Sequence, residues 1–183
     1  MASVYNIAKF DNSKPYVKNE IVLYDTDETN TGRTENHHWY ATKDVPAGST
    51  PSPTSDYWAG RVLDNGIQKP KFLWTPSYAS SADFNPTVTI SRFGDGYEQR
   101  VATNINNNFL KLSLKFDLRG KMEATAILHF LNQRRAVEAF VFDAPEPFGT
   151  AGGYQYFVCR SWNNNFSFYE NFSIGAQFEQ VAA

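Results

Sequence analysis

Two stretches of the chain alternate apolar and polar residues with the period of a β-strand. In residues 110–118 the apolar positions are Leu110, Leu112, Leu114, Phe116 and Leu118, and the residues between them are Lys111, Ser113, Lys115 and Asp117. In residues 172–179 the apolar set is Phe172, Ile174, Ala176 and Phe178, alternating with Ser173, Gly175, Gln177 and Glu179. Because successive side chains of a strand point to opposite faces, each stretch predicts a strand with one buried face.

Between these two strands the apolar spacing becomes that of a helix. Positions i, i+3, i+4 and i+7 are occupied by Ala124, Ile127, Leu128 and Leu131. This spacing predicts one amphipathic helix, which begins after Gly120 and ends near Arg134 and Arg135. Strand character returns at residues 137–142 and 154–162. We therefore expect a mainly β (α+β) protein whose C-terminal part is a β-sandwich with one packed α-helix.

Turn-forming residues divide the rest of the chain. Residues 48–53 read Gly-Ser-Thr-Pro-Ser-Pro, which predicts a loop. We expect residues 1–60 to form a small all-β module, residues 61–85 an ordered but irregular connector, and residues 86–183 a larger domain. Near the start of that domain, β-branched residues at 87–91 followed by Gly94-Asp95-Gly96 predict a β-hairpin turn.

Composition narrows the class of protein. The 183 residues are 16% aromatic and include only 2 Met, which favours sheets over helix bundles. A formal net charge of −2 gives no general attraction for nucleic acid or for an anionic membrane, so neither is an expected partner. The N-terminal segment is too charged for a signal peptide, and the single cysteine permits no intrachain disulfide, so we expect synthesis in a reducing host cytoplasm.

We find no catalytic, cofactor-binding or metal-binding motif in the sequence. Nucleophile-elbow, phosphate-loop and zinc-helix patterns are absent. Cys159 is interpreted as a small packing residue within a strand. The adjacent His37 and His38 point opposite ways in an extended chain, and the acidic stretch 25–32 lacks the spacing of a calcium loop. We expect no enzyme activity and no cofactor.

Four aromatic residues gather in the N-terminal module: Trp39, Tyr40, Tyr57 and Trp58. Exposed rings in a small β module can stack on the faces of sugars. A module of this size also needs large side chains to build any core at all. Sugar binding and core packing both remain open for these rings.

Three segments of the C-terminal domain carry a family resemblance. They are Phe93-Gly94-Asp95-Gly96-Tyr97-Glu98-Gln99-Arg100, Cys159-Arg160-Ser161-Trp162 and Gln177-Phe178-Glu179-Gln180-Val181. With Asn104-Ile105-Asn106 after the first of them, residues 86–181 resemble the phage minor tail protein family. The sequence departs from the family pattern at Ala102-Thr103-Asn104, where a glycine is usual before Ile-Asn, and in the Pro- and Gly-rich insertion 145–153.

The resemblance implies a structural protein at the tail tip of a virion with a long non-contractile tail. Such a subunit is expected to form a closed, hexameric ring with copies of itself between the tail tube and the tip. The other implied partners are the tail tube, the tail hub, and the tape measure or fibres. This role needs complementary edges rather than an active site. Polar and aromatic loops that flank the strands, such as residues 163–169, are candidate contact surfaces.

The N-terminal module has a second resemblance, to small chitin- and cellulose-binding modules. It rests on residues 16–24, Trp39-Tyr40-Ala41, Gly48-Ser49-Thr50-Pro51 and Trp58, with Asn19-Glu20 in place of Gly-Asp. The resemblance implies that Tyr40 and Trp58, with their neighbour Trp39, stack on sugar. Two functions therefore compete: a structural ring subunit whose N-terminal module decorates the tail, and a glycan-binding adhesion module that recognises host surface polysaccharide.

Overall fold

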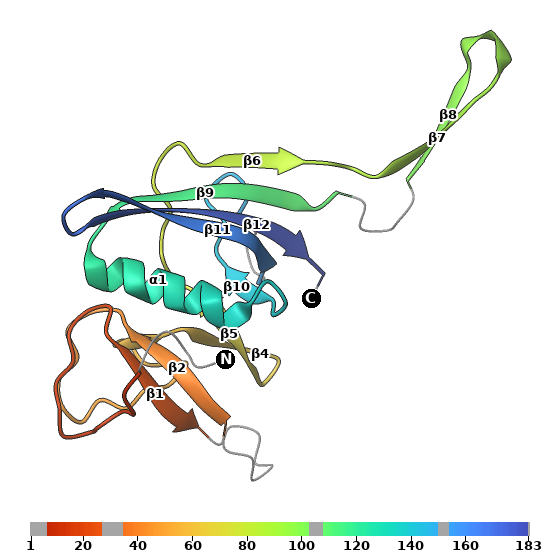
Figure 1. Cartoon of the computed structure of the whole chain (residues 1–183). Helices are drawn as coiled ribbons and strands as arrows, with labels where there is room; N and C mark the ends of the chain where they lie inside the picture. The colour runs from red at the N-terminus through yellow and green to blue at the C-terminus, as the bar shows by residue number, and fades with distance from the viewer. Residues whose placement is uncertain (1–6, 27–34, 103–107, 150–153, 183) are drawn as a thin grey trace.

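The computed structural model describes residues 7–26, 35–102, 108–149 and 154–182. This part of the chain is mostly β and contains one α-helix, which confirms the mainly β (α+β) class. Its strands form a three-stranded sheet, a seven-stranded sheet and a two-stranded hairpin (Figure 1).

The N-terminal part is a small antiparallel sheet with a core of its own. Its strands are β1 (Ile21–Thr26), β2 (Glu35–Ala41) and β3 (Trp58–Ala59), paired in that order. The buried residues of this core are Tyr16, Val22, Trp39, Ala41, Val45 and Trp58. The indole N–H of Trp58 donates to the Ser49 carbonyl oxygen at 2.8 Å, so the predicted proline-rich loop is tied to the core.

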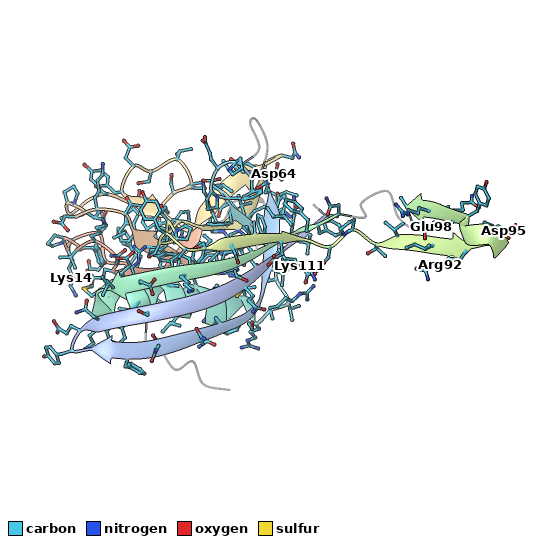
Figure 2. All side chains as sticks on the ribbon, turned by 90° about the horizontal axis from the view of Figure 1, so that it is seen from above. Lys14, Asp64, Arg92, Asp95, Glu98 and Lys111 are labelled. Carbon is cyan, nitrogen blue, oxygen red and sulfur yellow. The ribbon has the colours of Figure 1, made fainter. Side chains whose placement is uncertain are left out.

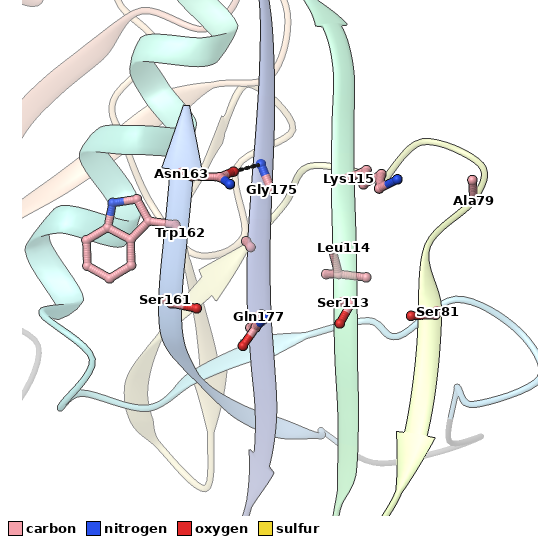
Figure 3. A pocket seen from close by; sticks show the side chains of 11 residues that line it. Ala79, Ser81, Ser113, Leu114, Lys115, Ser161, Trp162, Asn163, Gly175 and Gln177 are labelled. Atoms are coloured by element: carbon pink, nitrogen blue, oxygen red, sulfur yellow. Dashed lines mark hydrogen bonds between the residues drawn. The ribbon is translucent and has the colours of Figure 1, made fainter. Parts of the chain in front are cut away.

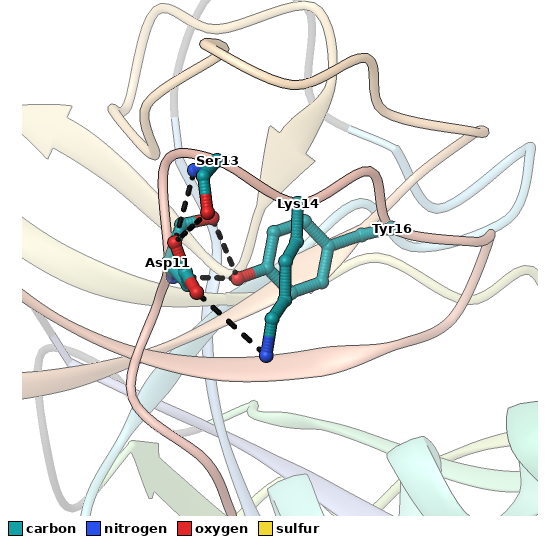
Figure 4. Close-up of polar contacts among 4 residues, drawn as sticks. All are labelled: Asp11, Ser13, Lys14 and Tyr16. Atoms are coloured by element: carbon teal, nitrogen blue, oxygen red, sulfur yellow. Dashed lines mark hydrogen bonds and ion pairs between the residues drawn. The ribbon is translucent and has the colours of Figure 1, made fainter.

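A compact turn leads the chain into this core (Figure 4). The Ser13 hydroxyl and amide donate to Asp11 Oδ1 at 2.6 and 3.0 Å, and Lys14 Nζ lies 3.6 Å from Asp11 Oδ2. The hydrogen bonds from Ser13 are the main reason that the pKa of Asp11 is lowered. The Asp11 amide donates to the Tyr16 hydroxyl at 2.6 Å, which connects this Asx-type turn to a buried ring.

The seven-stranded sheet has the strand order β4-β5-β10-β11-β12-β9-β6. Its members are β4 (Arg61–Asp64), β5 (Ile67–Phe72), β6 (Ser81–Phe84), β9 (Leu110–Arg119), β10 (Phe140–Phe142), β11 (Tyr156–Phe168) and β12 (Asn171–Val181). Neighbouring strands are antiparallel except β5 and β10, which are parallel. Helix α1 (Lys121–Arg134) lies between β6, β9, β11 and β12 on one side and β4 and β5 on the other (Figure 1).

Aromatic rings from the sheet and the helix meet in the main core. The Phe72 ring of β5 lies 5.5 Å from Phe116 of β9, 5.5 Å from Phe130 of α1 and 5.2 Å from Phe178 of β12, measured between centroids. All four rings are buried. Such pairs contribute about 0.5–1.5 kcal/mol each beyond the burial of their area, so Phe72 anchors β5 to the rest of the domain.

Both alternating segments form the predicted strands, with differences at Phe172, which is half-buried, and at Leu118. The inward residues Leu110, Leu112, Leu114, Phe116, Ile174, Ala176 and Phe178 are all buried. Leu118 was expected on the same buried face, but it is 75% exposed and has a φ of 56°. The pairing of β12 with β9 shifts register between Phe172 and Ile174, so the alternation in β9 ends before Leu118.

Helix α1 is the predicted amphipathic helix. Ala124, Ile127 and Leu131 of the predicted stripe are buried, whereas Leu128 is half-buried. The helix is packed on two sides, so it also buries Ala126, His129, Phe130 and Arg134. Arg119 Nη1 lies 2.7 Å from Glu123 Oε1 at its first turn. The helix ends where Arg135 takes a left-handed conformation, with its amide donating to the Leu131 carbonyl oxygen at 3.2 Å.

Residues 61–85 differ from the expected irregular connector, because they supply β4, β5 and β6 to the large sheet. Asn65 and Gly66, with φ values of 49° and 78°, form the turn between β4 and β5. Pro70 lies inside β5, although proline has no amide donor. The pairing of β10 with β5 begins only at Lys71 and Phe72, so that side of the ladder does not require a donor from Pro70.

Candidate assembly surface

A hairpin projects from the body of the protein (Figure 1). Its strands are β7 (Val88–Arg92) and β8 (Glu98–Ala102), and we call residues 88–102 the arm. The arm follows β6, the edge strand of the large sheet, and every residue of both its strands is exposed. A two-stranded hairpin alone is marginally stable in water, so the arm is an element that gains from contact with a partner.

The tip of the arm is the predicted hairpin turn, which the structure confirms. The 3₁₀ turn η1 (Gly94–Gly96) joins β7 to β8, and the Phe93 amide donates to the Tyr97 carbonyl oxygen at 2.8 Å. Asp95 and Gly96 have φ values of 67° and 82°, a region that glycine and aspartate tolerate better than most residues. The Phe93–Arg100 motif therefore forms the end of the arm.

The arm exposes apolar side chains along its length. They are Val88, Ile90, Phe93, Tyr97 and Val101. Val101 pairs with Thr89, so it lies on the face of the hairpin opposite Val88 and Ile90, and the arm offers apolar contacts to a partner on both faces. Of these side chains Tyr97 at the tip is the most exposed, at 75%. Its aromatic ring and hydroxyl suit a protein–protein interface.

Charged side chains of the arm form a small exposed cluster (Figure 2). Glu98 accepts from Arg100 Nε at 2.6 Å, and Arg92 Nε lies 3.7 Å from the other Glu98 oxygen. The Glu98 carboxylate thus forms ion pairs with the guanidinium groups of both Arg92 and Arg100. Exposed ion pairs of this kind stabilise the fold by at most about 1 kcal/mol, so their charges remain available to a partner.

A furrow crosses the outer face of the large sheet, on the side away from α1 (Figure 3). Its volume is about 390 Å³. Ser161, Gln177, Ser113 and Ser81 line it as one row across β11, β12, β9 and β6. Beside this row Asn163 Oδ1 accepts the Gly175 amide at 2.9 Å. Small polar residues at outward positions are also typical of a solvent-facing sheet, so the sequence pattern did not indicate a hollow here.

The predicted sugar-stacking residues lie in the interior. Trp39, Tyr40 and Trp58 are 0%, 1% and 2% exposed. Trp39 and Trp58 belong to the core of the N-terminal module, and Tyr40 belongs to the main core. A sugar stacks on an open ring face, and these rings pack on protein instead. Core packing, one of the two roles left open by the sequence, is the role they have here.

Two histidines meet where the N-terminal sheet contacts α1. The rings of His38 from β2 and His129 from α1 are 4.5 Å apart between centroids, and Tyr40 Oη lies 3.0 Å from His129 Nδ1. Burial, followed by the charge of Arg134, lowers the pKa of His38 to about 4. Burial, followed by the charge of His38, lowers the pKa of His129 to about 4. Both imidazoles are therefore neutral at pH 7.

The other candidate residues for chemistry take structural positions. Cys159 is buried in β11, and burial raises the pKa of its thiol to about 12. Residues 27–34, most of the acidic stretch, lie outside the described residues. Within the described ranges, His, Cys, Asp and Glu side chains form no group of three able to hold a metal ion. The same part of the chain has no helix that could span a membrane.

Comparison with known proteins identifies the class of protein that carries this arm. The model of the phage minor tail protein family matches residues 70–182 of the 183-residue chain, and the chain belongs to this family. The predicted resemblance is thereby confirmed. The protein is a structural component of a phage tail and associates with other tail proteins.

The chain is also similar to two individual proteins. The chain is 27% identical over 110 residues to tail tip protein M of Escherichia phage lambda, a match that covers 60% of this chain and 95% of that protein. A chain from the tail of an empty GTA particle with C6 symmetry aligns over 89% of this chain and 90% of its own length. That alignment has 14% identity and a TM-score of 0.39.

Proposed function

We propose that this protein forms a closed ring at the tip of the phage tail, between the tail tube and the tip. The observation that carries the proposal is the arm, whose two strands are exposed at every residue and carry apolar side chains, beside a body with a buried aromatic core. The similarity to a tail tip protein over nearly the whole length of that protein supports the position. The family resemblance of the sequence also implies that the ring is a hexamer.

A ring subunit of this kind acts through surfaces. A heterologous contact between identical subunits closes into a ring when the rotation between neighbours permits it. We therefore assign the chain a structural role without catalysis. Its proposed partners are further copies of itself, the tail tube, the tail hub, and the tape measure or fibres, after synthesis in the host cytoplasm.

We further propose a division of labour along the chain. Residues 86–183, with the arm, build the ring, and residues 1–60 form a module that decorates its outside. The separate core of the N-terminal sheet supports this division. Residues 61–85 join the two parts and contribute strands to the large sheet.

The position can be tested on intact virions. A peptide tag on the N-terminus would be detected with gold-labelled antibody in electron micrographs of purified particles. We expect label only at the end of the tail distal to the capsid. Label along the tube, or at the junction with the capsid, would contradict the proposed position. Particles that lack the tag are the control and give the level of nonspecific label.

A further inference from the structure

Strand β2 contributes to two cores through its two faces. Trp39 and Ala41 belong to the core of the N-terminal module, whereas Tyr40 belongs to the main core. His38 is two residues from Tyr40 and lies on the same face of the strand. Its ring centroid is 4.5 Å from that of His129 on α1. The contact between the module and α1 therefore includes a pair of histidine rings.

Cationic side chains stand around this pair. Burial is the main reason that the pKa of each imidazole is low, and the charge of Arg134 on α1 lowers both further. His37 of β2 and Arg61 of β4 also lower the pKa of His38. Glu138 offsets part of the Arg134 charge, because its Oε2 lies 2.6 Å from Arg134 Nη1. A proton added to either ring is thus placed in a poorly solvated site beside positive charge.

The hydroxyl of Tyr40 is a further titratable group in this contact. It lies 3.0 Å from Nδ1 of His129. Burial raises the pKa of the Tyr40 phenol, so the hydroxyl stays protonated in acid and at neutral pH. It therefore supplies no negative charge that would hold a proton on the imidazole.

Gly60 connects this contact to the large sheet. Strand β3 ends at Ala59 and pairs with β2, and strand β4 begins at Arg61 and pairs with β5, so Gly60 stands alone between them. Its φ is 124°, and glycine has access to backbone conformations that are closed to other residues. Because the module has a core of its own, it can turn at Gly60 as a unit, which takes Tyr40 out of the main core.

We propose that protonation of His38 and His129 in mild acid separates the N-terminal module from α1, while the core of the module stays intact. The closed form buries both imidazoles beside cations, whereas the open form exposes them to water. A ligand that binds one of two forms more tightly shifts the equilibrium toward that form, and here the ligand is the proton. This device is independent of the proposed ring.

The size of the effect follows from the pKa values. Each imidazole has a pKa of about 4 in the closed form, against 6.5 for an exposed histidine. The closed form is therefore most stable above pH 6.5 and loses stability as the pH falls toward 4. Between pH 7 and pH 5 the equilibrium constant for opening should rise by roughly twentyfold for each imidazole, and by roughly several hundredfold for both.

Hydrogen exchange at tryptophan indoles, measured by NMR on the full chain, distinguishes opening from unfolding. Trp74 is 4% exposed, and its ring centroid lies 5.1 Å from that of Tyr40, so opening uncovers it. Trp39 lies in the core of the module and stays covered. We expect Trp74 to exchange faster than Trp39 at every pH between 7 and 5. Equal rates at the two indoles would mean that the protein opens only by global unfolding, which overturns the proposal.

Histidine variants test the trigger. Each Trp74 rate is divided by that of N-acetyltryptophanamide at the same pH, which removes the intrinsic pH dependence of exchange. From pH 7 to pH 5 the corrected rate should rise roughly several hundredfold in the wild type but only roughly twentyfold in His38→Asn or in His129→Gln. His37→Asn, on the opposite face of the same strand, is the matched control and should keep the wild-type rise. A wild-type rise in both test variants, or an equal reduction in the control, overturns the proposal.

Discussion

Tyr40 Oη lies 3.0 Å from Nδ1 of His129, and this contact joins strand β2 of the N-terminal module to helix α1 of the large domain. Burial raises the pKa of the Tyr40 phenol, so the hydroxyl stays protonated and forms a hydrogen bond with the neutral imidazole. The Tyr40 ring also packs edge to face on Trp74, with centroids 5.1 Å apart. The N-terminal module is therefore joined to the large domain by specific side-chain contacts as well as by the covalent connection between them.

Tyr40→Phe removes this hydrogen bond and keeps the ring. We expect the free energy of unfolding to fall by about 1–3 kcal/mol, because a buried hydrogen bond between the two side chains is lost. Urea unfolding at pH 7 measures the change. Tyr57→Phe, on a half-buried ring of the same module, is the control and should be nearly neutral. Equal effects of the two substitutions would show that the contact with His129 does not stabilise the protein.

The histidine pair predicts a loss of stability in mild acid. His38 and His129 have pKa values of about 4 in the folded protein and 6.5 when unfolded. The unfolded chain therefore binds protons first, and stability falls as the pH falls from about 6.5 to about 4. The slope is at most about 1.4 kcal/mol per pH unit for each histidine. Arg134, His37 and Arg61 add positive charge around His38 and oppose its protonation.

Unfolding measured from pH 7 to pH 4.5 in the wild type and in His38→Asn tests this directly. The variant should lose part of the slope, since one of the two titrating imidazoles is gone. The lowered pKa values of the Asp11 and Glu179 carboxyls add to the slope only near the acidic end of this range, and both carboxyls are present in both proteins, so the difference in slope between wild type and variant reports His38. An unchanged slope in the variant would mean that His38 is not responsible.

Gly60 is required for the close approach of the chain to strand β2, directly after β3. Its φ is 124°, and a Cβ at this position would lie 2.8 Å from Tyr40 Cδ2 and 3.2 Å from the His38 carbonyl oxygen. Gly48 has a similar φ of 91° but open space around it. We expect Gly60→Ala to lower the melting temperature much more than Gly48→Ala does. Overpacking at Gly60 should cost about 1–3 kcal/mol of unfolding free energy in addition to the backbone strain that both variants share. Equal melting temperatures would contradict a tight contact.

The orientation of β9 can be tested at two neighbouring residues. Leu114 is buried in the core, whereas Lys115 is exposed on the outer face. Leu114→Asp places an unpaired charge in the core and should cost several kcal/mol, enough to abolish soluble protein. Lys115→Asp should give a normal yield. Soluble yield and melting temperature measure both, and a normal Leu114→Asp protein would show that the buried face is wrong.

The elements that the sequence predicted well are those whose apolar residues repeat with one period. Strand β9 and helix α1 show such repeats, and both formed where expected. Leu118 fits the repeat of β9 but lies beyond a register shift, which depends on pairing with β12. Strand β5 was missed because Pro70 predicts a loop, and only the limited pairing with β10 permits a proline there.

The candidate site was partly visible in the sequence. Gly94-Asp95-Gly96 predicted the hairpin turn from local backbone preference alone. The projection of the arm from the body depends on tertiary packing, and a local sequence pattern carries no information about such packing. Trp39 and Trp58 show the converse, because their residue type fitted both sugar binding and a core, and the tertiary contacts decided between the two.

The central claim is that the chain assembles into a closed ring through its arm. Native mass spectrometry of the purified full chain, with end-on class averages of the same sample, tests it most directly. We expect a discrete species at six times 20.7 kDa that appears as a closed ring, and we expect Tyr97→Asp to abolish it. A monomer of 20.7 kDa at every concentration, or a ring that Tyr97→Asp leaves intact, would contradict it.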